Sequence, residues 1–113
     1  MRGDELAELL ERGEIALLDV RTAAEYEGAA GYPCDPRQGH ILGAVNVELD
    51  ELYAAGGDVR GLLGERGVDA DRRIVAYCHS GSRSEIAAAL LRAAGLEATN
   101  YEGSWHEWSR RPE

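Results

Sequence analysis

The sequence predicts an α/β domain with a mainly parallel sheet of four to five strands and helices on both faces. Short apolar segments of strand length alternate along the chain with segments of helical periodicity, which is typical of strands joined by helical crossovers. The segment at 15–20 is apolar except for Asp19 and the segment at 74–77 is continuously apolar, as expected for strands covered on both faces. With 113 residues, 44% of them hydrophobic, the chain can bury one core, so we expect one domain over residues 1–113.

In the first half of the chain we expect a helix, a buried strand, a short helix, a long loop and a second strand. Their ranges are 4–12, 15–20, 22–28, 28–39 and 43–49. Thr22 is the expected N-cap of the short helix. The loop is rich in glycine and proline, and its length is unusual within a compact domain, which indicates a functional role.

The second half is predicted to contain two short helices punctuated by glycine, the clearest strand, the clearest helix, a last strand and a terminal helix. Their ranges are 50–56, 58–67, 72–78, 84–95, 97–101 and 103–111. We expect Ser84 to be the N-cap of the clearest helix and Gly95 to follow its end. Trp105 and Trp108 share one face of the terminal helix, where they either pack on the core or line a pocket rim.

Composition and charge exclude several classes of protein. The net charge of −9 argues against nonspecific binding of nucleic acid, which needs a basic surface. The sequence has no run of 18 apolar residues, and its charged start is unlike a signal peptide, so we expect a cytoplasmic protein that does not bind membranes. Two cysteines, Cys34 and Cys78, do not make a disulfide framework.

The segment YCHSGSRSE, at 77–85, is the expected site of chemistry. Cys78 ends the clearest strand, and ligands of open α/β sheets bind beyond such ends. The turn that follows brings main-chain amides and the start of a helix together, which makes a cradle for an anion and favours the thiolate of Cys78. We therefore interpret Cys78 as a nucleophile rather than a buried small hydrophobe. The expected binding loop comprises His79, Ser80, Gly81, Ser82, Arg83 and Ser84, with His79 facing solvent rather than acting as a base.

Four segments resemble a rhodanese-type sulfurtransferase domain: LLDVRTAAEYEG (17–28), GHILGAVNVELDEL (39–52), IVAYCHSGSRS (74–84) and NYEGSWHEW (100–108). The last is most similar to thiosulfate and 3-mercaptopyruvate sulfurtransferases. The resemblance implies a three-layer rhodanese-like fold. It also implies that Cys78 takes a sulfane sulfur from a small donor as a persulfide, in a loop braced by Arg83, and passes it to cyanide, a thiol or a protein acceptor. No metal and no organic cofactor are implied.

The resemblance gives further residues a structural role near the site. Asp19 and Arg21 are expected to tie loops together by ion pairing, and His40 is expected to be a buried, hydrogen-bonded scaffold residue. A metal site made by His40 with Cys34 is a less favoured alternative. We interpret Cys34 as an incidental loop thiol, although it could instead resolve the persulfide or carry the sulfur onward. Arg37 is expected to be a solvated loop residue, or else a positive charge at the pocket rim.

Three departures from the family pattern carry expectations of their own. Vertebrate two-domain thiosulfate enzymes have basic residues where this chain has Glu25 and Ser80, so a preference for thiosulfate itself is not expected. A stand-alone domain lacks a domain interface over its pocket, so the pocket is expected to be more open, which suits a protein thiol or a low-molecular-weight thiol as acceptor. The chain begins almost at its first helix, so the edge strand that usually precedes this helix is expected to be short or missing.

Two other functions are consistent with parts of the pattern. A phosphatase or arsenate reductase of the Cdc25-like type shares the fold and the cysteine–arginine loop, but places five residues between the two, whereas only His79 to Ser82 lie between Cys78 and Arg83 here. A non-catalytic rhodanese-like binding module is the alternative outside enzymes. Such modules often lack the cysteine, which this chain retains.

Overall fold

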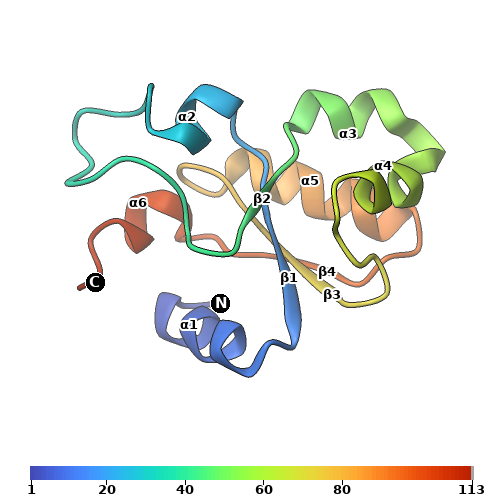
Figure 1. Ribbon diagram of the computed structural model, residues 1–113, viewed down its shortest axis with the longest axis horizontal. Coiled ribbons are helices and arrows are strands. Elements are labelled where there is room, and N and C mark those ends of the chain that lie inside the picture. The colour runs from blue at the N-terminus through green and yellow to red at the C-terminus, as the bar shows by residue number, and fades with distance from the viewer. Residues whose placement is uncertain (113) are drawn as a thin grey trace.

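A computed structural model describes residues 1–112, which form a four-stranded parallel sheet flanked by helices (Figure 1). The strand order is β2-β1-β3-β4. The strands are β1 (Ile15–Asp19), β2 (Val45–Asn46), β3 (Arg73–Tyr77) and β4 (Ala98–Asn100). The helices are α1 (Gly3–Arg12), α2 (Ala23–Glu27), α3 (Leu49–Ala55), α4 (Val59–Glu65), α5 (Ser82–Ala93) and α6 (Ser104–Trp108), with a 3₁₀ turn, η1 (Gly56–Asp58). The α/β prediction and its order of elements are confirmed.

The sheet separates two hydrophobic cores, one on each face. Helices α3, α4 and α5 cover one face, and α1 and α6 lie on the other (Figure 1). The first core contains Leu52, Leu63 and Leu91, together with Cys78. The second core contains Leu6 and Trp105. Because β1 and β3 are covered on both sides, they are apolar from 15 to 18 and from 74 to 77, as expected for central parallel strands.

The two central strands end side by side. Asp19 pairs with Tyr77 at the last register position of β1 and β3, so the segments that follow them leave the sheet at the same edge. Strand β2 is shorter than the predicted range 43–49, although the main chain stays close to β1, because Val47 N still donates to Asp19 O at 2.9 Å. This edge of the sheet carries the predicted site of chemistry.

The ends of two helices test the predicted caps. Thr22 is the N-cap of α2, as predicted, and it forms a capping box with Glu25. Helix α5 starts at Ser82, two residues earlier than predicted, and its N-cap is Gly81. The assignment of Ser84 as N-cap is therefore wrong, because this serine lies within the first turn and is fully buried. Gly95 has a φ of 89° beyond the end of α5, as predicted.

The first and last described residues bear on the remaining expectations about the fold. Within residues 1–112, α1 is the first regular element, so no edge strand precedes it among them. None of the helices in this range has the length and apolarity needed to cross a membrane. The last position of the expected domain, 113, lies outside the described residues.

Candidate active site

The thiol of Cys78 lies at the centre of hydrogen-bond donors. The amide of Gly81 donates to Cys78 Sγ at 3.1 Å, and the hydroxyl of Ser84 donates to the same sulfur at 3.3 Å. Cys78 itself is fully buried and is packed against the core beneath α5. The sulfur is therefore surrounded by aliphatic groups on one side and by donors from the loop and the start of α5 on the other.

These donors decide the charge that the sulfur prefers. Burial alone would raise the pKa of the Cys78 thiol. The hydroxyl of Ser84 and the amides of Ser84, Gly81 and Ser80 act against burial and outweigh it, so the pKa of Cys78 lies below its ordinary value. Because a thiolate is the nucleophilic form of cysteine, this arrangement activates the sulfur without a neighbouring base.

Residues of the segment 100–104 hold the loop that follows Cys78 in place. Gly81 has a φ of 99°, and a Cβ at this position would lie 2.6 Å from the carbonyl oxygen of Glu102. Asn100 Nδ2 donates to Gly81 O at 3.1 Å, and Ser104 Oγ accepts from Cys78 N at 3.1 Å. The turn therefore requires glycine at position 81.

Ser104 and Asn100 are functional supports that the sequence analysis missed. Ser104 is fully buried and has a φ of 54°, a conformation that a residue other than glycine rarely adopts. This conformation places its hydroxyl between Cys78 N and Tyr101 O, to which it donates at 2.9 Å. The only signal in the sequence was the position of this serine within the segment NYEGSWHEW, next to glycine.

Arg83 points to a carboxylate rather than to open solvent. Its Nη1 and Nη2 donate to the two oxygens of Glu25 at 2.8 and 3.0 Å. Burial acts to raise the pKa of Glu25, but Arg83 and Thr22 outweigh it and lower this pKa to about 2. The predicted bracing role of Arg83 agrees with this geometry. Because the guanidinium is paired with the carboxylate of Glu25, the charge of Arg83 is largely neutralised.

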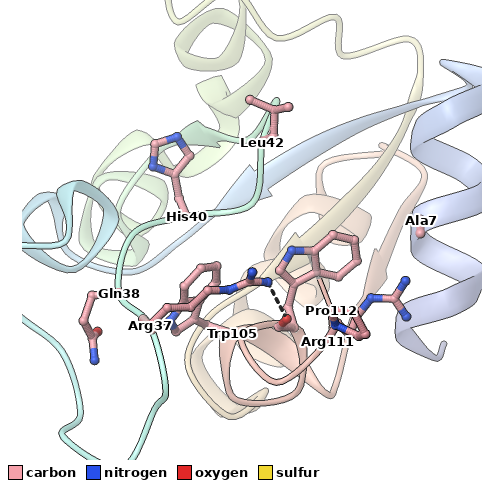
Figure 2. A pocket seen from close by; sticks show the side chains of 9 residues that line it. Ala7, Arg37, Gln38, His40, Leu42, Trp105, Arg111 and Pro112 are labelled. Carbon is pink, nitrogen blue, oxygen red and sulfur yellow. Dashed lines mark hydrogen bonds between the residues drawn. The ribbon is translucent and has the colours of Figure 1, made fainter.

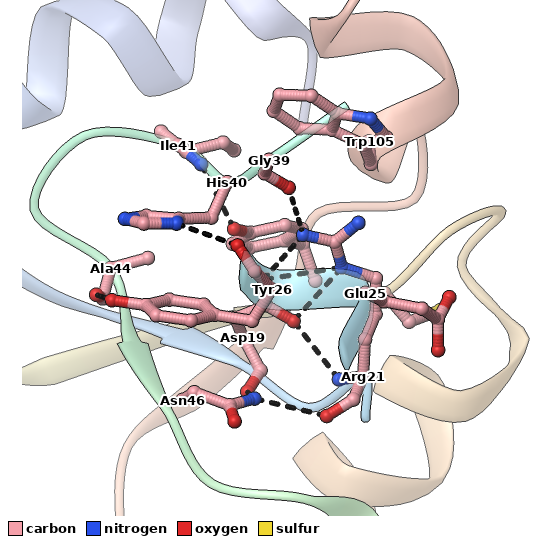
Figure 3. A network of polar contacts seen from close by, with 12 residues as sticks. Asp19, Arg21, Glu25, Tyr26, Gly39, His40, Ile41, Ala44, Asn46 and Trp105 are labelled. Atoms are coloured by element: carbon pink, nitrogen blue, oxygen red, sulfur yellow. Dashed lines mark hydrogen bonds and ion pairs between the residues drawn. The ribbon is translucent and has the colours of Figure 1, made fainter. Parts of the chain in front are cut away.

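Asp19 and Arg21 form a buried ion pair beside the loop of residues 28–39 (Figure 3). Arg21 Nη2 donates to Asp19 Oδ2 at 2.7 Å and to the carbonyl oxygen of Gly39 at 2.6 Å. The guanidinium also lies 5.6 and 5.2 Å from the ring centroids of Tyr77 and Trp105. The expected tie between loops is therefore present, and it holds the far end of residues 28–39 against the sheet.

The expectation for His40 was half wrong. Its Nδ1 lies 2.8 Å from Tyr26 O, and its ring stacks on that of Tyr26 with centroids 3.7 Å apart, so it is hydrogen-bonded as expected (Figure 3). The residue is exposed, however, not buried. The ring of Tyr26 supports the imidazole at the surface, a contact that no local sequence pattern predicts.

His79 is also placed differently from the prediction. Its side chain is 12% exposed instead of facing solvent, and its Nε2 lies 2.9 Å from Asp35 Oδ2. The ring of Tyr32 stacks on it at 3.7 Å between centroids. Asp35, whose side chain is fully buried, was missed, because a single aspartate in a loop rich in proline and glycine carries no distinctive pattern.

Arg37 packs against the terminal helix instead of standing at the rim of the Cys78 site. Its Nη2 donates to Trp108 O at 3.0 Å, and its guanidinium lies 5.9 Å from the ring centroid of Trp105. Together these side chains line a hollow of about 470 Å³, with His40 and Leu42 beside them (Figure 2). Trp105 is also buried in the core, so both expected roles of the tryptophans, packing and lining, are combined.

Comparison with known proteins agrees with this geometry. The model of the family described as "Rhodanese-like domain" matches residues 3–111. The Mycobacterium tuberculosis protein named "Putative thiosulfate sulfurtransferase SseB" is 35% identical over 106 residues, which cover 88% of this chain and 37% of that protein. The 3-mercaptopyruvate sulfurtransferase of Escherichia coli K12 is 34% identical over 104 residues, which cover 84% of this chain and 36% of the relative.

Solved structures extend the likeness to a protein of similar length. A human single-domain sulfurtransferase, TSTD1, superimposes with a TM-score of 0.73 at 29% identity, and the match covers 100% of this chain and 96% of the human one. In contrast, the chain spans about two fifths of the length of the curated relatives that it matches. The similarity therefore covers the described sheet and the loop at 78–84, not the remainder of those longer proteins.

Proposed function

Because this chain belongs to the rhodanese-like domain family, we propose that it is a sulfurtransferase that carries sulfur as a persulfide on Cys78. The observation that carries the proposal is the set of donors on Cys78 Sγ, from Gly81 N at 3.1 Å and Ser84 Oγ at 3.3 Å. The match of the family over residues 3–111 supports residues 1–113 as one catalytic domain.

The reaction proceeds in two displacement steps. The Cys78 thiolate attacks the sulfane sulfur of thiosulfate or the thiol sulfur of mercaptopyruvate, and a new sulfur–sulfur bond forms. The S–S bond of thiosulfate or the C–S bond of mercaptopyruvate breaks, and the remaining part of the donor leaves with the bonding electron pair. For mercaptopyruvate the group that leaves is the enolate of pyruvate, which takes up a proton. An acceptor thiolate or cyanide then attacks the outer sulfur, and Cys78 leaves as the thiolate. The enzyme returns to its starting state, so it needs no external oxidant or reductant.

The donors around the thiolate also serve the persulfide. An outer sulfur added to Cys78 carries negative charge next to the amides of the loop and the start of α5. Ser84 and Gly81 already donate to the inner sulfur, so little rearrangement is needed when the charge moves outward. We infer that Ser80 and Ser82, which are exposed on the same loop, face the incoming substrate.

The charges near Arg83 favour a donor of low charge. A cavity of about 100 Å³ is lined by Arg83, Thr22 and Val20, but also by Glu48 and Asp50. Since Glu25 neutralises Arg83, the acidic side chains set the local potential. We therefore expect the singly charged carboxylate of mercaptopyruvate to be a better donor than doubly charged thiosulfate, in line with the departure at Glu25. The acceptor is a low-molecular-weight thiol or a thiol of a partner protein.

The alternative of a Cdc25-like phosphatase or arsenate reductase is less consistent with the site. Four residues, 79–82, lie between Cys78 and Arg83, and Arg83 is paired with Glu25 rather than being available for a tetrahedral oxyanion. A non-catalytic binding module would not require donors on a buried sulfur. The intact loop therefore favours sulfur transfer over both alternatives.

Steady-state kinetics test the proposal. With mercaptopyruvate or thiosulfate as donor and cyanide as acceptor, we expect parallel double-reciprocal plots, as for a ping-pong scheme. Replacing Cys78 with serine is expected to lower the rate by on the order of 10³-fold or more. Hydrolysis of p-nitrophenyl phosphate without any transfer of sulfur would overturn the assignment in favour of a phosphatase. If local charge sets the preference for the donor, Asp50→Asn should raise kcat/KM for thiosulfate more than kcat/KM for mercaptopyruvate.

A further inference from the structure

Four side chains, one of them on the active-site loop and three beside it, bring metal-binding atoms to one place. The four-donor cluster consists of Cys34, Asp35, His79 and His106, which each offer one ligand atom, and these atoms all lie within 4.8 Å of one another. The residues come from the loop at 28–39, from the position after Cys78 and from α6. We propose that this cluster binds a divalent transition-metal ion of the zinc type, a function separate from sulfur transfer.

The distances within the cluster are close to those that a tetrahedral ion requires. Asp35 Oδ2 lies 2.9 Å from His79 Nε2, and Asp35 Oδ1 lies 3.5 Å from His106 Nδ1. Cys34 Sγ lies 3.9 Å from Asp35 Oδ1. A zinc ion with bonds of about 2.0–2.3 Å separates its ligand atoms by about 3.3–3.8 Å. Each residue offers one ligand atom and these atoms lie within 4.8 Å of one another, so the most separated pair must approach by about 1 Å to complete a coordination shell.

The donor set matches the ion in chemistry and in charge. Thiolate, imidazole and carboxylate are the three ligand types that zinc takes in proteins. When Cys34 coordinates, its thiol proton passes to solvent, and the thiolate together with the carboxylate of Asp35 balances the two positive charges of the ion. Cys34 is exposed and the His106 side chain is 51% exposed, so an ion can enter from solvent.

A positive group already occupies this position. Arg110 Nη1 donates to Asp35 Oδ1 at 2.9 Å and lies 3.2 Å from His106 Nδ1, while its Nη2 donates to Cys34 O at 2.9 Å. The guanidinium thus contacts two of the four ligand atoms. Its side chain is 38% exposed near the C-terminal end, so it can leave towards solvent. We infer that the arginine stands in for the metal ion and competes with it.

Contacts with neighbouring aromatic rings fix the orientation of two of the ligands, His79 and His106. The ring of Tyr32 stacks on His79 at 3.7 Å between centroids, and the ring of His79 meets that of His106 edge to face at 5.5 Å. Fixed imidazole rings lower the cost of assembling a site, since less side-chain freedom is lost on binding. A bound ion would join three segments that are far apart in the sequence.

Titration of the reduced 113-residue chain with Co²⁺ tests the site through its spectrum. We expect one equivalent to give the intense visible bands of a tetrahedral site and a near-ultraviolet thiolate charge-transfer band, both removed by adding Zn²⁺. Cys34→Ser should remove the charge-transfer band, whereas Cys78→Ser should keep it. His106→Ala should weaken binding by 10-fold or more, with its melting temperature in the absence of metal as the control for folding.

The competing arginine provides a change in the opposite direction. Arg110→Ala should bind Co²⁺ more tightly than the parent chain, while Arg111→Ala, which removes a guanidinium stacked on Trp108, should bind it equally well. Zn²⁺ should also raise the melting temperature of the parent chain but not that of His106→Ala. The proposal is overturned by weak octahedral spectra in both the parent and Arg110→Ala, or by a thiolate band that depends on Cys78. Neither result bears on sulfur transfer, which is measured separately.

Discussion

The loop at 78–81 and the loop at 28–39 touch one another, yet they are held in opposite ways. The first is short and is fixed mainly by main-chain groups and small side chains, including Gly81 N on Cys78 Sγ at 3.1 Å. The second is long and is fixed by large side chains from elsewhere, such as Arg21 on Gly39 O at 2.6 Å. The comparison shows that the loop carrying the thiol is shaped by main-chain groups and small side chains, whereas the longer loop is held by a large charged side chain.

Replacing Arg21 should have the largest effect, on the long loop and on stability. Arg21→Met leaves the buried carboxylate of Asp19 unpaired, so we expect the free energy of unfolding to fall by about 3–5 kcal/mol. Urea denaturation measures this loss. The matched control is Arg60→Met, which breaks an exposed pair with Asp71 and should cost at most about 1 kcal/mol. Equal losses in the two variants would show that the buried pair is not the anchor.

Gly81→Ala should act on the short loop. The added Cβ would lie 2.6 Å from Glu102 O at a φ of 99°, so the turn must shift. We expect a loss of about 1–3 kcal/mol in stability and about 10²-fold in kcat/KM for sulfur transfer. Gly95→Ala, at a φ of 89° with open space around it, is the control that carries the strain without the contact. Full activity in Gly81→Ala would contradict the proposed geometry.

The pair that links the two regions should respond to pH. The pKa of Glu25 is about 2 in the folded chain against 4.5 for the free side chain, because Arg83 and Thr22 stabilise the carboxylate despite its burial. This stabilisation is present above pH 4.5 and is lost as the pH falls towards 2. Glu25→Gln should therefore be about 1–2 kcal/mol less stable than the parent at pH 6.

That difference in stability should shrink as the solution is acidified, which urea titrations at several pH values can follow. Glu65→Gln, at an exposed position, is the control and should stay within about 0.5 kcal/mol of the parent throughout. A difference between Glu25→Gln and the parent that does not change with pH would mean that the ion pair with Arg83 does not contribute.

Ser84→Ala should have the smallest effect on stability and a selective effect on the thiol. Without the hydroxyl at 3.3 Å, the pKa of Cys78 should rise, because burial would then be opposed by amides alone. We expect the rate of alkylation by iodoacetamide at pH 7 to fall on the order of 10-fold. Ser82→Ala, which changes an exposed serine of the same turn, should react like the parent chain. An unchanged rate in Ser84→Ala would rule out the hydroxyl as a donor to the thiolate.

The sequence predicts well the features that depend on neighbouring residues, and predicts poorly those that depend on contacts between distant residues. The strands at 15–20 and 72–78, the helix after them and the position of Cys78 depend on residues that are neighbours in sequence, so local patterns are sufficient. The partners of Arg83 and His79 could not be predicted in this way. Glu25 and Asp35 reach them from 58 and 44 residues away, and no local pattern encodes such contacts.

The errors in the sequence analysis have one physical origin. The residue type of Ser84 predicts an N-cap, but in the folded chain its hydroxyl is buried and donates to the sulfur of Cys78. His40 was expected to be buried, whereas stacking on Tyr26 holds it at the surface. In both cases the residue type was informative about hydrogen bonding and uninformative about direction.

The most direct test of the central claim is the intact mass of the chain after incubation with mercaptopyruvate and removal of the donor. We predict the gain of one sulfur atom in the parent chain and in Cys34→Ser, its loss on adding cyanide, and no gain in Cys78→Ser. A gain that persists in Cys78→Ser and disappears in Cys34→Ser would contradict the account, because the sulfur would then be carried by the exposed thiol and not by the one held among the loop amides.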